Sequence, residues 1–323
     1  MGFNNVISRT DAAALIPEDV SNVLLAEIEG SNPILQLAQR LPNIPRAQQR
    51  MPVLASLAHA YFVDGDTGLK KTTELTWKNK YIDAAEIAAI VPIPMSVLDD
   101  VDYDIWGQVR PELVKAFNKV IVQAALYGAN IPATWTTNLG AAGIVLGSTN
   151  AGHTISAAAY TDMYEAILGE TAAGVAGQMM LIEADGFMAN GHVAHVSMRG
   201  KLRNVRDAEG QPIFTRSMQD RTRYELDGAP VFFPLDGSIV AASGLDIGGD
   251  WQQLLWAMRQ DMTYTIATEG VIQDANGNIV YNLFQQDMVA LRAVMRLGVA
   301  LPNPINRMNE NDATRYPFSV LTA

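Results

Sequence analysis

The feature that most constrains the fold is a predicted two-stranded ribbon carrying aromatic side chains that it cannot bury by itself. Strand-like runs at residues 53–57, 60–63 and 72–77 flank the sequence Asp64-Gly65-Asp66-Thr67-Gly68, whose glycines favour a hairpin turn. Because two strands alone are only marginally stable in water, a neighbour must cover this ribbon, either within the chain or from another chain. The ribbon mixes aromatic residues with lysines, and five of them are candidate intersubunit contacts: Tyr61, Phe62, Lys70, Lys71 and Trp77.

Composition excludes several classes of protein. With 323 residues, 49% hydrophobic and 18% charged, the chain can bury a large core and is neither wholly disordered nor membrane-inserted. The absence of cysteine removes disulfides, thiolate metal sites and cysteine nucleophiles. A formal net charge of −11 disfavours tight, sequence-reading DNA binding, but it is compatible with loose contact to enclosed DNA. Because neither a membrane span nor a signal segment is evident, we expect a protein made and used in a cytoplasm, with no membrane partner.

A long helix is predicted over residues 104–128. Apolar residues recur there at helical spacing, Asp102 or Asp104 can cap the start, and Gly128 can end the helix. Pro111 should either kink this helix or mark a late start.

The remaining segments indicate a mixture of helices and strands. Residues 11–40 are predicted to hold two helical pieces, residues 129–155 a surface connection, and residues 156–173 a second helix. Strands are predicted later in the chain, with a turn at 274–278 between the last two: 178–182, 193–198, 228–234, 239–242, 263–267 and 288–301.

Residue patterns that could carry chemistry have simpler structural interpretations. His192 and His195 would point to opposite faces of a strand, which disfavours a shared metal, and His59 and His153 are expected at the surface. Ser197 and Ser243 lack the surroundings of a nucleophile elbow, and Asp99 and Asp100 are expected to cap the helix that follows. Gly248-Gly249-Asp250 is expected to be an ordinary turn. We therefore predict no catalytic, cofactor-binding or metal site and no enzyme activity.

Seven short phrases, in their order along the chain, resemble the major capsid proteins of tailed bacteriophages with the Hong Kong ninety-seven fold. Each phrase is weak alone, and the specific signal is their order over nearly the whole chain. The phrases are Leu15-Ile16-Pro17-Glu18, Arg50-Met51-Pro52-Val53-Leu54, Ala60-Tyr61-Phe62-Val63-Asp64-Gly65, Val97-Leu98-Asp99-Asp100, Leu126-Tyr127-Gly128, Gly248-Gly249-Asp250-Trp251 and residues 289–296.

The resemblance implies an α+β fold with four parts. Residues 1–45 would form an N-terminal arm, and residues 46–82 an extended β-hairpin loop that lies on an adjacent subunit. Residues 83–135 and 256–323 would form a peripheral domain with the long helix as its spine, and residues 136–255 an axial domain. Some family members carry a long N-terminal scaffolding segment that this sequence lacks. Either a separate scaffolding protein or a removed segment would account for its absence.

The function implied by the resemblance is an icosahedral head shell around double-stranded DNA, located in the virion and assembled in the bacterial host cytoplasm. The implied partners are further copies as hexamers and pentamers, a portal protein, a separate scaffolding protein, a decoration protein and non-specifically packaged DNA. An encapsulin-like compartment shell is the alternative with the same fold, and a cytoplasmic α/β enzyme is the alternative from another class.

The two loop lysines allow two interpretations. Lys70 and Lys71 can form a solvated loop tip or contact the acidic surface of a neighbour. In some family members a loop lysine forms an isopeptide bond with a late asparagine, a position comparable to Asn303 or Asn306. Because no glutamate can be assigned to assist such a bond, we expect shells without covalent crosslinks.

Overall fold

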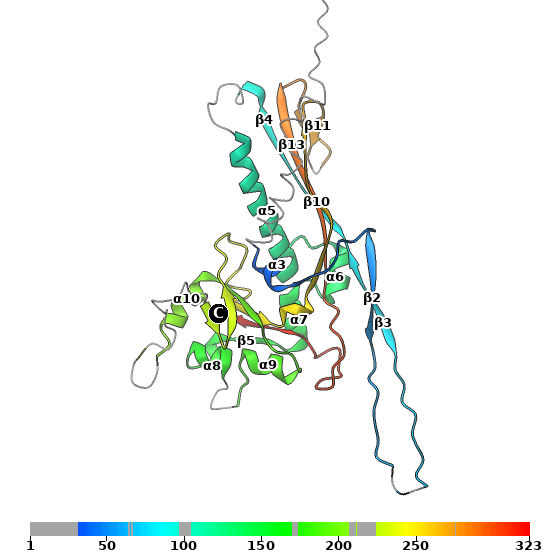
Figure 1. Cartoon of the computed structure of the whole chain (residues 1–323). Helices are drawn as coiled ribbons and strands as arrows, with labels where there is room; N and C mark the ends of the chain where they lie inside the picture. The colour runs from blue at the N-terminus through cyan, green and yellow to red at the C-terminus, as the bar shows by residue number, and fades with distance from the viewer. Residues whose placement is uncertain are drawn as a thin grey trace, which may run out of the picture. The chain divides into compact units, whose positions relative to one another are not determined.

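The computed structural model describes residues 32–63, 65, 67–96, 105–169, 174–206, 211, 224–274 and 276–323. These residues form two compact units. The first unit draws on residues 86–118 and 260–296, and the second on residues 32–85, 119–259 and 297–323. Helices and sheets both contribute (Figure 1), which confirms the α+β class. The four-part division into arm, loop, peripheral domain and axial domain stays a prediction.

The long helix is present as α5 (Ile105–Tyr127), which confirms the prediction for 104–128. Its buried face includes Phe117, Ile121 and Leu126, each at most 2% exposed. Gly128 ends the helix with a left-handed φ of 68°, and a Cβ there would collide with the backbone carbonyl of Ala142. Pro111 lies inside α5, so the alternative of a late start is wrong.

A six-stranded sheet forms the core of the second unit, in the order β5-β14-β9-β6-β8-β7. Strand β14 at the end of the chain lies between β5, to which it is parallel, and β9, to which it is antiparallel. The strand bounds are β5 (Thr154–Ser156), β6 (Gly191–Ala194), β7 (Tyr224–Leu226), β8 (Ala229–Phe232), β9 (Asp246–Gly249) and β14 (Phe318–Thr322). Strands β6 and β9 are buried along their whole length, so this sheet is an internal layer.

A second sheet has four strands in the order β1-β10-β13-β4. Their bounds are β1 (Gln39–Arg40), β4 (Ala85–Pro94), β10 (Leu255–Ala267) and β13 (Met288–Ala300). The late strands predicted at 263–267 and 288–301 are therefore confirmed, although β10 begins earlier. Between them, β11 (Val271–Gln273) and β12 (Ile279–Asn282) form a small ribbon around the expected turn at 274–278.

The prediction of a surface connection at 129–155 is wrong. This segment contains α6 (Ala133–Leu139) and α7 (Ile144–Ala151), with Trp135 and Ile144 almost fully buried. Its glycines, read as loop residues, instead end these helices, because Gly140 and Gly152 adopt the left-handed conformation after α6 and α7.

Two of the predicted strands are also wrong, at 178–182 and 239–242, and a third, at 193–198, is a strand only at its first two residues. Residues 178–182 belong to α9 (Gln178–Ala184), a run of good helix formers too short to show its period. The run 193–198 changes structure after β6, where the side chain of His195 caps α10 (Val196–Arg203). Residues 239–242 form a turn region rather than a strand. The strand predicted at 228–234 is confirmed as β8.

The predicted N-terminal and second helices are only partly recovered. Asn32 caps α3 (Pro33–Leu37) by accepting hydrogen bonds from the backbone N–H groups of Ile34 and Leu35, which confirms the second piece of 11–40. The first piece lies outside the described residues. Within 156–173, a short 3-10 helix (Ala157–Ala159) precedes α8 (Met163–Leu168), and Asp162 caps α8. Residues 170–173 lie outside the described part.

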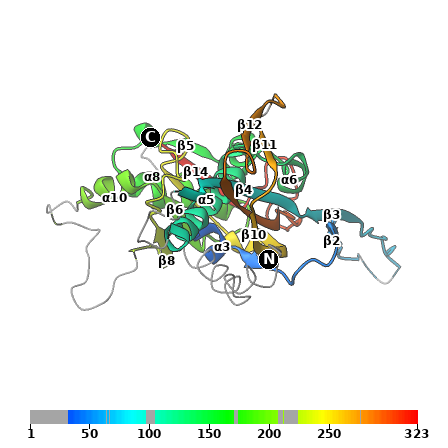
Figure 2. The ribbon, with the colours of Figure 1, turned by 90° about the horizontal axis from the view of Figure 1, so that it is seen from above.

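The predicted ribbon exists, but its strands are displaced from the predicted runs. Strand β2 (Gln48–Leu54) pairs antiparallel with β3 (Trp77–Asp83), from Gln48 opposite Asp83 to Leu54 opposite Trp77. Residues 60–63 and 72–76 are not strands, so the chain beyond β2 and β3 continues as a long extended loop (Figure 1). Figure 2 shows this ribbon and α10 on opposite sides of the second unit.

Candidate intersubunit surface

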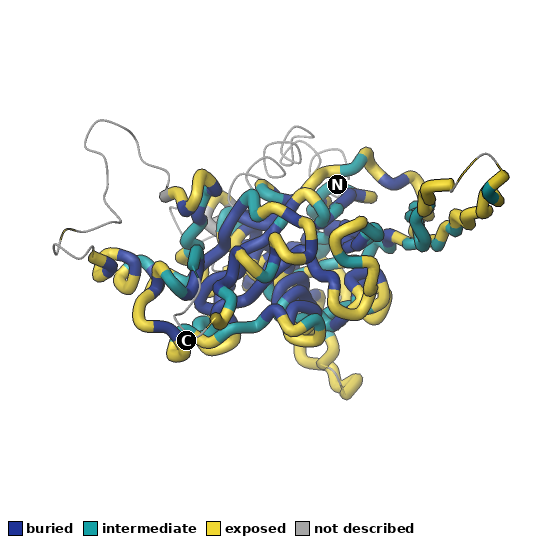
Figure 3. The backbone as a smooth tube through the Cα atoms, turned by 90° about the horizontal axis from the view of Figure 1, so that it is seen from below, coloured by how far each residue is buried: buried dark blue, intermediate teal, exposed yellow. Residues whose placement is uncertain are grey.

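The extended loop, residues 55–76, projects from the β2–β3 ribbon with little covering it. In Figure 3 its described residues are exposed or intermediate along nearly the whole path. Phe62 and Leu69 are 107% and 92% exposed, and Trp77 at the start of β3 is 65% exposed. Large apolar side chains at such exposure are typical of an interaction surface when they are grouped in this way.

The hydrogen bonds that join the two sides of the extended loop, among its described residues, lie near the ribbon. The backbone N–H of Ala55 donates to the Thr76 carbonyl at 2.8 Å, and the N–H of His59 donates to the Thr73 hydroxyl at 3.0 Å. Between residues 60 and 72, the described residues make no hydrogen bond or ion pair. The Lys71 ammonium lies 5.3 Å from the centre of the Tyr61 ring, a cation–π contact.

A C-terminal loop, residues 303–316, holds the base of the extended loop. The Lys78 ammonium contacts a carboxylate oxygen of Asp312 at 2.6 Å, and Arg307 donates to the Ala58 carbonyl at 3.1 Å. Burial alone raises the pKa of Asp312, but the hydrogen bond and charge of Lys78, with the charges of Arg315 and Lys80, lower it below its ordinary value. The base is therefore fixed while the rest of the extended loop is free to contact another molecule.

The C-terminal loop is itself anchored by a buried carboxylate. Asp185, after α9, accepts hydrogen bonds from the Tyr316 backbone N–H and the Asn309 side-chain amide, both at 2.7 Å. The His153 ring nitrogen lies 3.2 Å from the same carboxylate. Burial lowers the pKa of His153, while Asp185 and the Phe318 carbonyl oppose this effect. The expectation that His153 lies at the surface is wrong, because it is 5% exposed, whereas His59 is exposed as expected.

The five candidate contact residues all lie in or next to the extended loop. Tyr61, Phe62 and Trp77 are exposed, and so are Lys70 and Lys71. The structure therefore places them together on one projecting segment of the second unit. Their role as intersubunit contacts stays a prediction.

The histidines and glycines considered above for a metal or phosphate site have structural roles in the second unit. His192 is fully buried on β6 and contacts Asp246 at 2.8 Å, while the ring of His195 lies 2.8 Å from the Ser197 hydroxyl at the start of α10. Gly248 and Gly249 lie in β9, so the prediction of a turn there is wrong. A Cβ at Gly248 would meet the His192 ring, which explains why this strand position is glycine.

Ser243 was also considered as a nucleophile, and Asp99 and Asp100 as a carboxylate pair. Ser243 lies in a turn region, and Asp99 and Asp100 lie outside the described residues. Among the described residues, no group of three or more histidine, aspartate or glutamate side chains is placed to hold a metal ion.

Asn303 and Asn306 are engaged within the chain. The Asn303 side-chain amide donates to the Arg315 carbonyl at 2.9 Å, and the Asn306 amide donates to the Asp185 carbonyl at 2.6 Å. Asn303 is also 9% exposed. A lysine attacking either amide would have to displace these hydrogen bonds.

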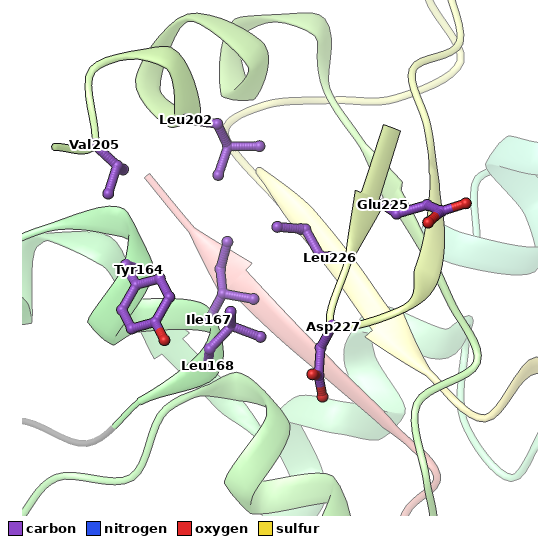
Figure 4. Close-up of a pocket in the computed structure, with 8 residues that line it drawn as sticks. All are labelled: Tyr164, Ile167, Leu168, Leu202, Val205, Glu225, Leu226 and Asp227. Atoms are coloured by element: carbon purple, nitrogen blue, oxygen red, sulfur yellow. The ribbon is translucent and has the colours of Figure 1, made fainter. Parts of the chain in front are cut away.

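An apolar pocket lies between α8, α10 and β7 (Figure 4). Its aliphatic side chains gather around the centre, and the carboxylates of Glu225 and Asp227 stand at its edge. The lining residues are Tyr164, Ile167, Leu168, Leu202, Val205, Glu225, Leu226 and Asp227. No nucleophile and base are paired among these lining residues.

Sequence reasoning missed Asp185 and Arg315, which organise the C-terminal loop. Arg315 is 1% exposed, and its guanidinium donates to Asn303, Asn309 and Asp312. No local pattern marks Asp185, because its partners lie in another segment of the chain, whereas the partners of Arg315 lie within the C-terminal loop itself.

Comparison with known proteins agrees with this architecture. The major capsid protein of Staphylococcus phage 80alpha is 25% identical over 300 residues, which covers 92% of this chain and 84% of that protein. A solved structure from Microbacterium phage Oxtober96 has a TM-score of 0.74 and 30% identity, covering 98% of this chain and 99% of that chain. A structure from Mycobacterium phage Cain has a TM-score of 0.73 and 25% identity, covering 98% of both chains.

These similarities define the fold as that of a viral shell protein. The model of the Phage capsid family matches residues 12–306, and the chain belongs to this family. This is a family of structural proteins. Among the described helices, none is long and apolar enough to cross a membrane.

Proposed function

We propose that the chain is a major capsid protein that tiles the icosahedral head shell of a tailed bacteriophage around double-stranded DNA. The observation that carries the proposal is the extended loop, whose apolar side chains Phe62 and Leu69 are left exposed by the described part of the chain. Covering them on a neighbouring copy is the simplest way to bury this surface. The Phage capsid match over residues 12–306 supports the same conclusion.

We further propose that the copies form hexamers and pentamers, and that portal, scaffolding and decoration proteins are partners in the host cytoplasm. The net charge of −11 supports loose enclosure of DNA rather than tight binding, because a container needs little affinity for its contents. The axial and peripheral domains would follow the boundaries at 135/136 and 255/256.

Assembly of the purified protein tests the proposed function. We expect closed shells, hexamers or pentamers in negative-stain images, with a co-expressed scaffolding protein if none form alone. A monodisperse species near 35.0 kDa under both conditions would contradict the proposal. Shells that enclose an enzyme and lack a portal would instead indicate an encapsulin-like compartment.

Mature shells should be free of covalent crosslinks. Lys70 and Lys71 are exposed, whereas attack on an amide needs an amine that is desolvated beside a positioned general base. Asn303 and Asn306 are occupied by internal hydrogen bonds. Boiled particles should therefore run as a single band at subunit mass in a denaturing gel. A denaturant-resistant ladder that Lys70→Ala or Lys71→Ala removes would contradict this.

A further inference from the structure

The apolar pocket between α8, α10 and β7 has room for a side chain from another molecule. Its aliphatic wall includes Ile167, Leu202 and Leu226, each at most 8% exposed, while Tyr164 on the same wall is 47% exposed. The volume of the pocket is about 170 Å³. An apolar cavity of about 150 Å³ accommodates a benzene-sized group, so this pocket can hold one leucine side chain.

Two exposed carboxylates, those of Glu225 and Asp227, stand at the edge of this pocket (Figure 4). Asp227 and Gly228 form the tight turn between β7 and β8, both with positive φ, so the hairpin fixes Asp227 at the end of β7. Neither carboxylate makes an ion pair or hydrogen bond with a described residue. The other lining residues are uncharged, and the α10 cations Lys201 and Arg203 are not among them. The pocket therefore fits an apolar side chain that lies next to a cation.

Leu69 in the extended loop is an apolar side chain of this kind. It is 92% exposed, and the two residues that follow it, Lys70 and Lys71, are exposed as well. The Lys71 ammonium already lies over the Tyr61 ring. Lys70 is therefore the cation that can pair with a carboxylate of another copy without giving up a contact to a described residue.

The other large apolar side chains at the loop match the pocket less well. The charged residue nearest to Phe62 in the sequence is Asp64, whose negative charge the two carboxylates at the pocket edge would repel. Next to Trp77, the Lys78 ammonium is already held by Asp312 at 2.6 Å. Leu69 is thus the side chain whose surroundings best complement the pocket.

The loop and the pocket lie on opposite sides of the second unit. Figure 2 shows the ribbon that carries the loop on one side and α10, which lines the pocket, on the other. A contact between two different surfaces of the same chain is head-to-tail, and it closes into a ring when the rotation between copies allows. We propose that Leu69 of one copy enters this pocket on the next copy of a ring, with Lys70 beside Glu225 and Asp227. This inference rests on the proposed function and names the surface that receives the extended loop.

Thiol cross-linking tests the contact directly, because the natural chain has no cysteine. The double variant Lys70→Cys with Glu225→Cys places one thiol on the loop and one at the pocket edge, both at exposed positions, so the subunit should fold. Treatment with a short bismaleimide should give a ladder of linked subunits beyond the dimer on a denaturing gel. Lys70→Cys with Met188→Cys is the matched control and should stay monomeric, because Met188 is 77% exposed in the same unit but does not line the pocket.

Cross-linking both assembled shells and concentrated unassembled protein separates this inference from the proposed function. A ladder without shells supports the pocket contact while the proposed function fails. Shells without a ladder overturn the pocket contact and leave the proposed function standing, and the absence of both overturns both. Links within one chain, links that end at the dimer, or an equal ladder in the control would also overturn the pocket contact.

Charge exchange gives a second test, which needs no cross-linker. Lys70→Glu should lower the yield of shells by about fivefold, since an ion pair is lost and like charges face each other. Adding Glu225→Lys to this variant should restore the yield. Glu183→Lys, at an exposed position of α9 outside the pocket, restores the same net charge and should not restore the yield. Equal recovery by both second changes would overturn the pairing.

Discussion

Replacing Trp77 by alanine should reduce the yield of assembled shells by about tenfold or more while leaving the subunit folded. Trp77 is 65% exposed in the single chain, so its truncation removes little burial there and should change the free energy of unfolding by about 1 kcal/mol or less. At an interface, a large aromatic side chain is a common hot spot, typically worth about 2–4 kcal/mol. The yield of shells in sedimentation measures the effect on assembly. Denaturant unfolding of the unassembled subunit measures the effect on its stability.

Trp135 provides the matched control for this variant. It is 1% exposed, and its indole N–H donates to the Asp83 carbonyl at 3.1 Å. Trp135→Ala should therefore lower the free energy of unfolding by about 3–5 kcal/mol, since it leaves a cavity in the core. If Trp77→Ala destabilised the isolated subunit as strongly as Trp135→Ala and spared assembly, Trp77 would belong to an internal core and the contact assignment would be wrong.

Replacing Asp185 by alanine should lower the free energy of unfolding by about 3–5 kcal/mol. The carboxylate accepts hydrogen bonds from the Tyr316 backbone N–H and the Asn309 amide, and it contacts His153. All these groups are buried or half-buried, so its loss leaves donors without partners in a region that water reaches poorly. The C-terminal loop should detach, and with it the Lys78–Asp312 contact at the base of the extended loop.

Asp162→Ala is the matched control for Asp185→Ala. The Asp162 carboxylate also accepts two hydrogen bonds, from the backbone N–H groups of Tyr164 and Glu165, but it is exposed. Loss of this helix cap should cost only about 1 kcal/mol. Denaturant titration of unassembled subunits measures both variants, and equal losses would show that the buried network does not anchor the C-terminal loop.

The elements that could be predicted from sequence are those that carry their own signal. Helix α5 runs over many turns, so its apolar period and its terminal glycine are visible without tertiary information. Strand β13 is likewise a long apolar run with β-branched residues. The short helices α6, α7 and α9 were missed because each is only two turns long, and packing rather than periodicity stabilises them.

For the same reason, only part of the candidate intersubunit surface could be predicted from the sequence. Phe62 in the extended loop and Trp77 at the start of β3 are both exposed, and the local sequence alone shows that a predicted hairpin could not bury them. The groups that hold the base of the ribbon are not local, because Lys78 and Asp312 are 234 positions apart and Asp185 and Tyr316 are 131 apart. Nothing near any of these residues indicates its partner, so sequence reasoning could not find the C-terminal loop as the anchor.

A density map of the assembled shell, in which residues 55–76 are traced, tests the central claim most directly. The account predicts that this loop lies on a neighbouring subunit, with Phe62, Leu69 and Trp77 losing most of the exposure that they have in the single chain. The account would be contradicted if the loop folded back on its own subunit, or if these three side chains stayed in solvent within a closed shell.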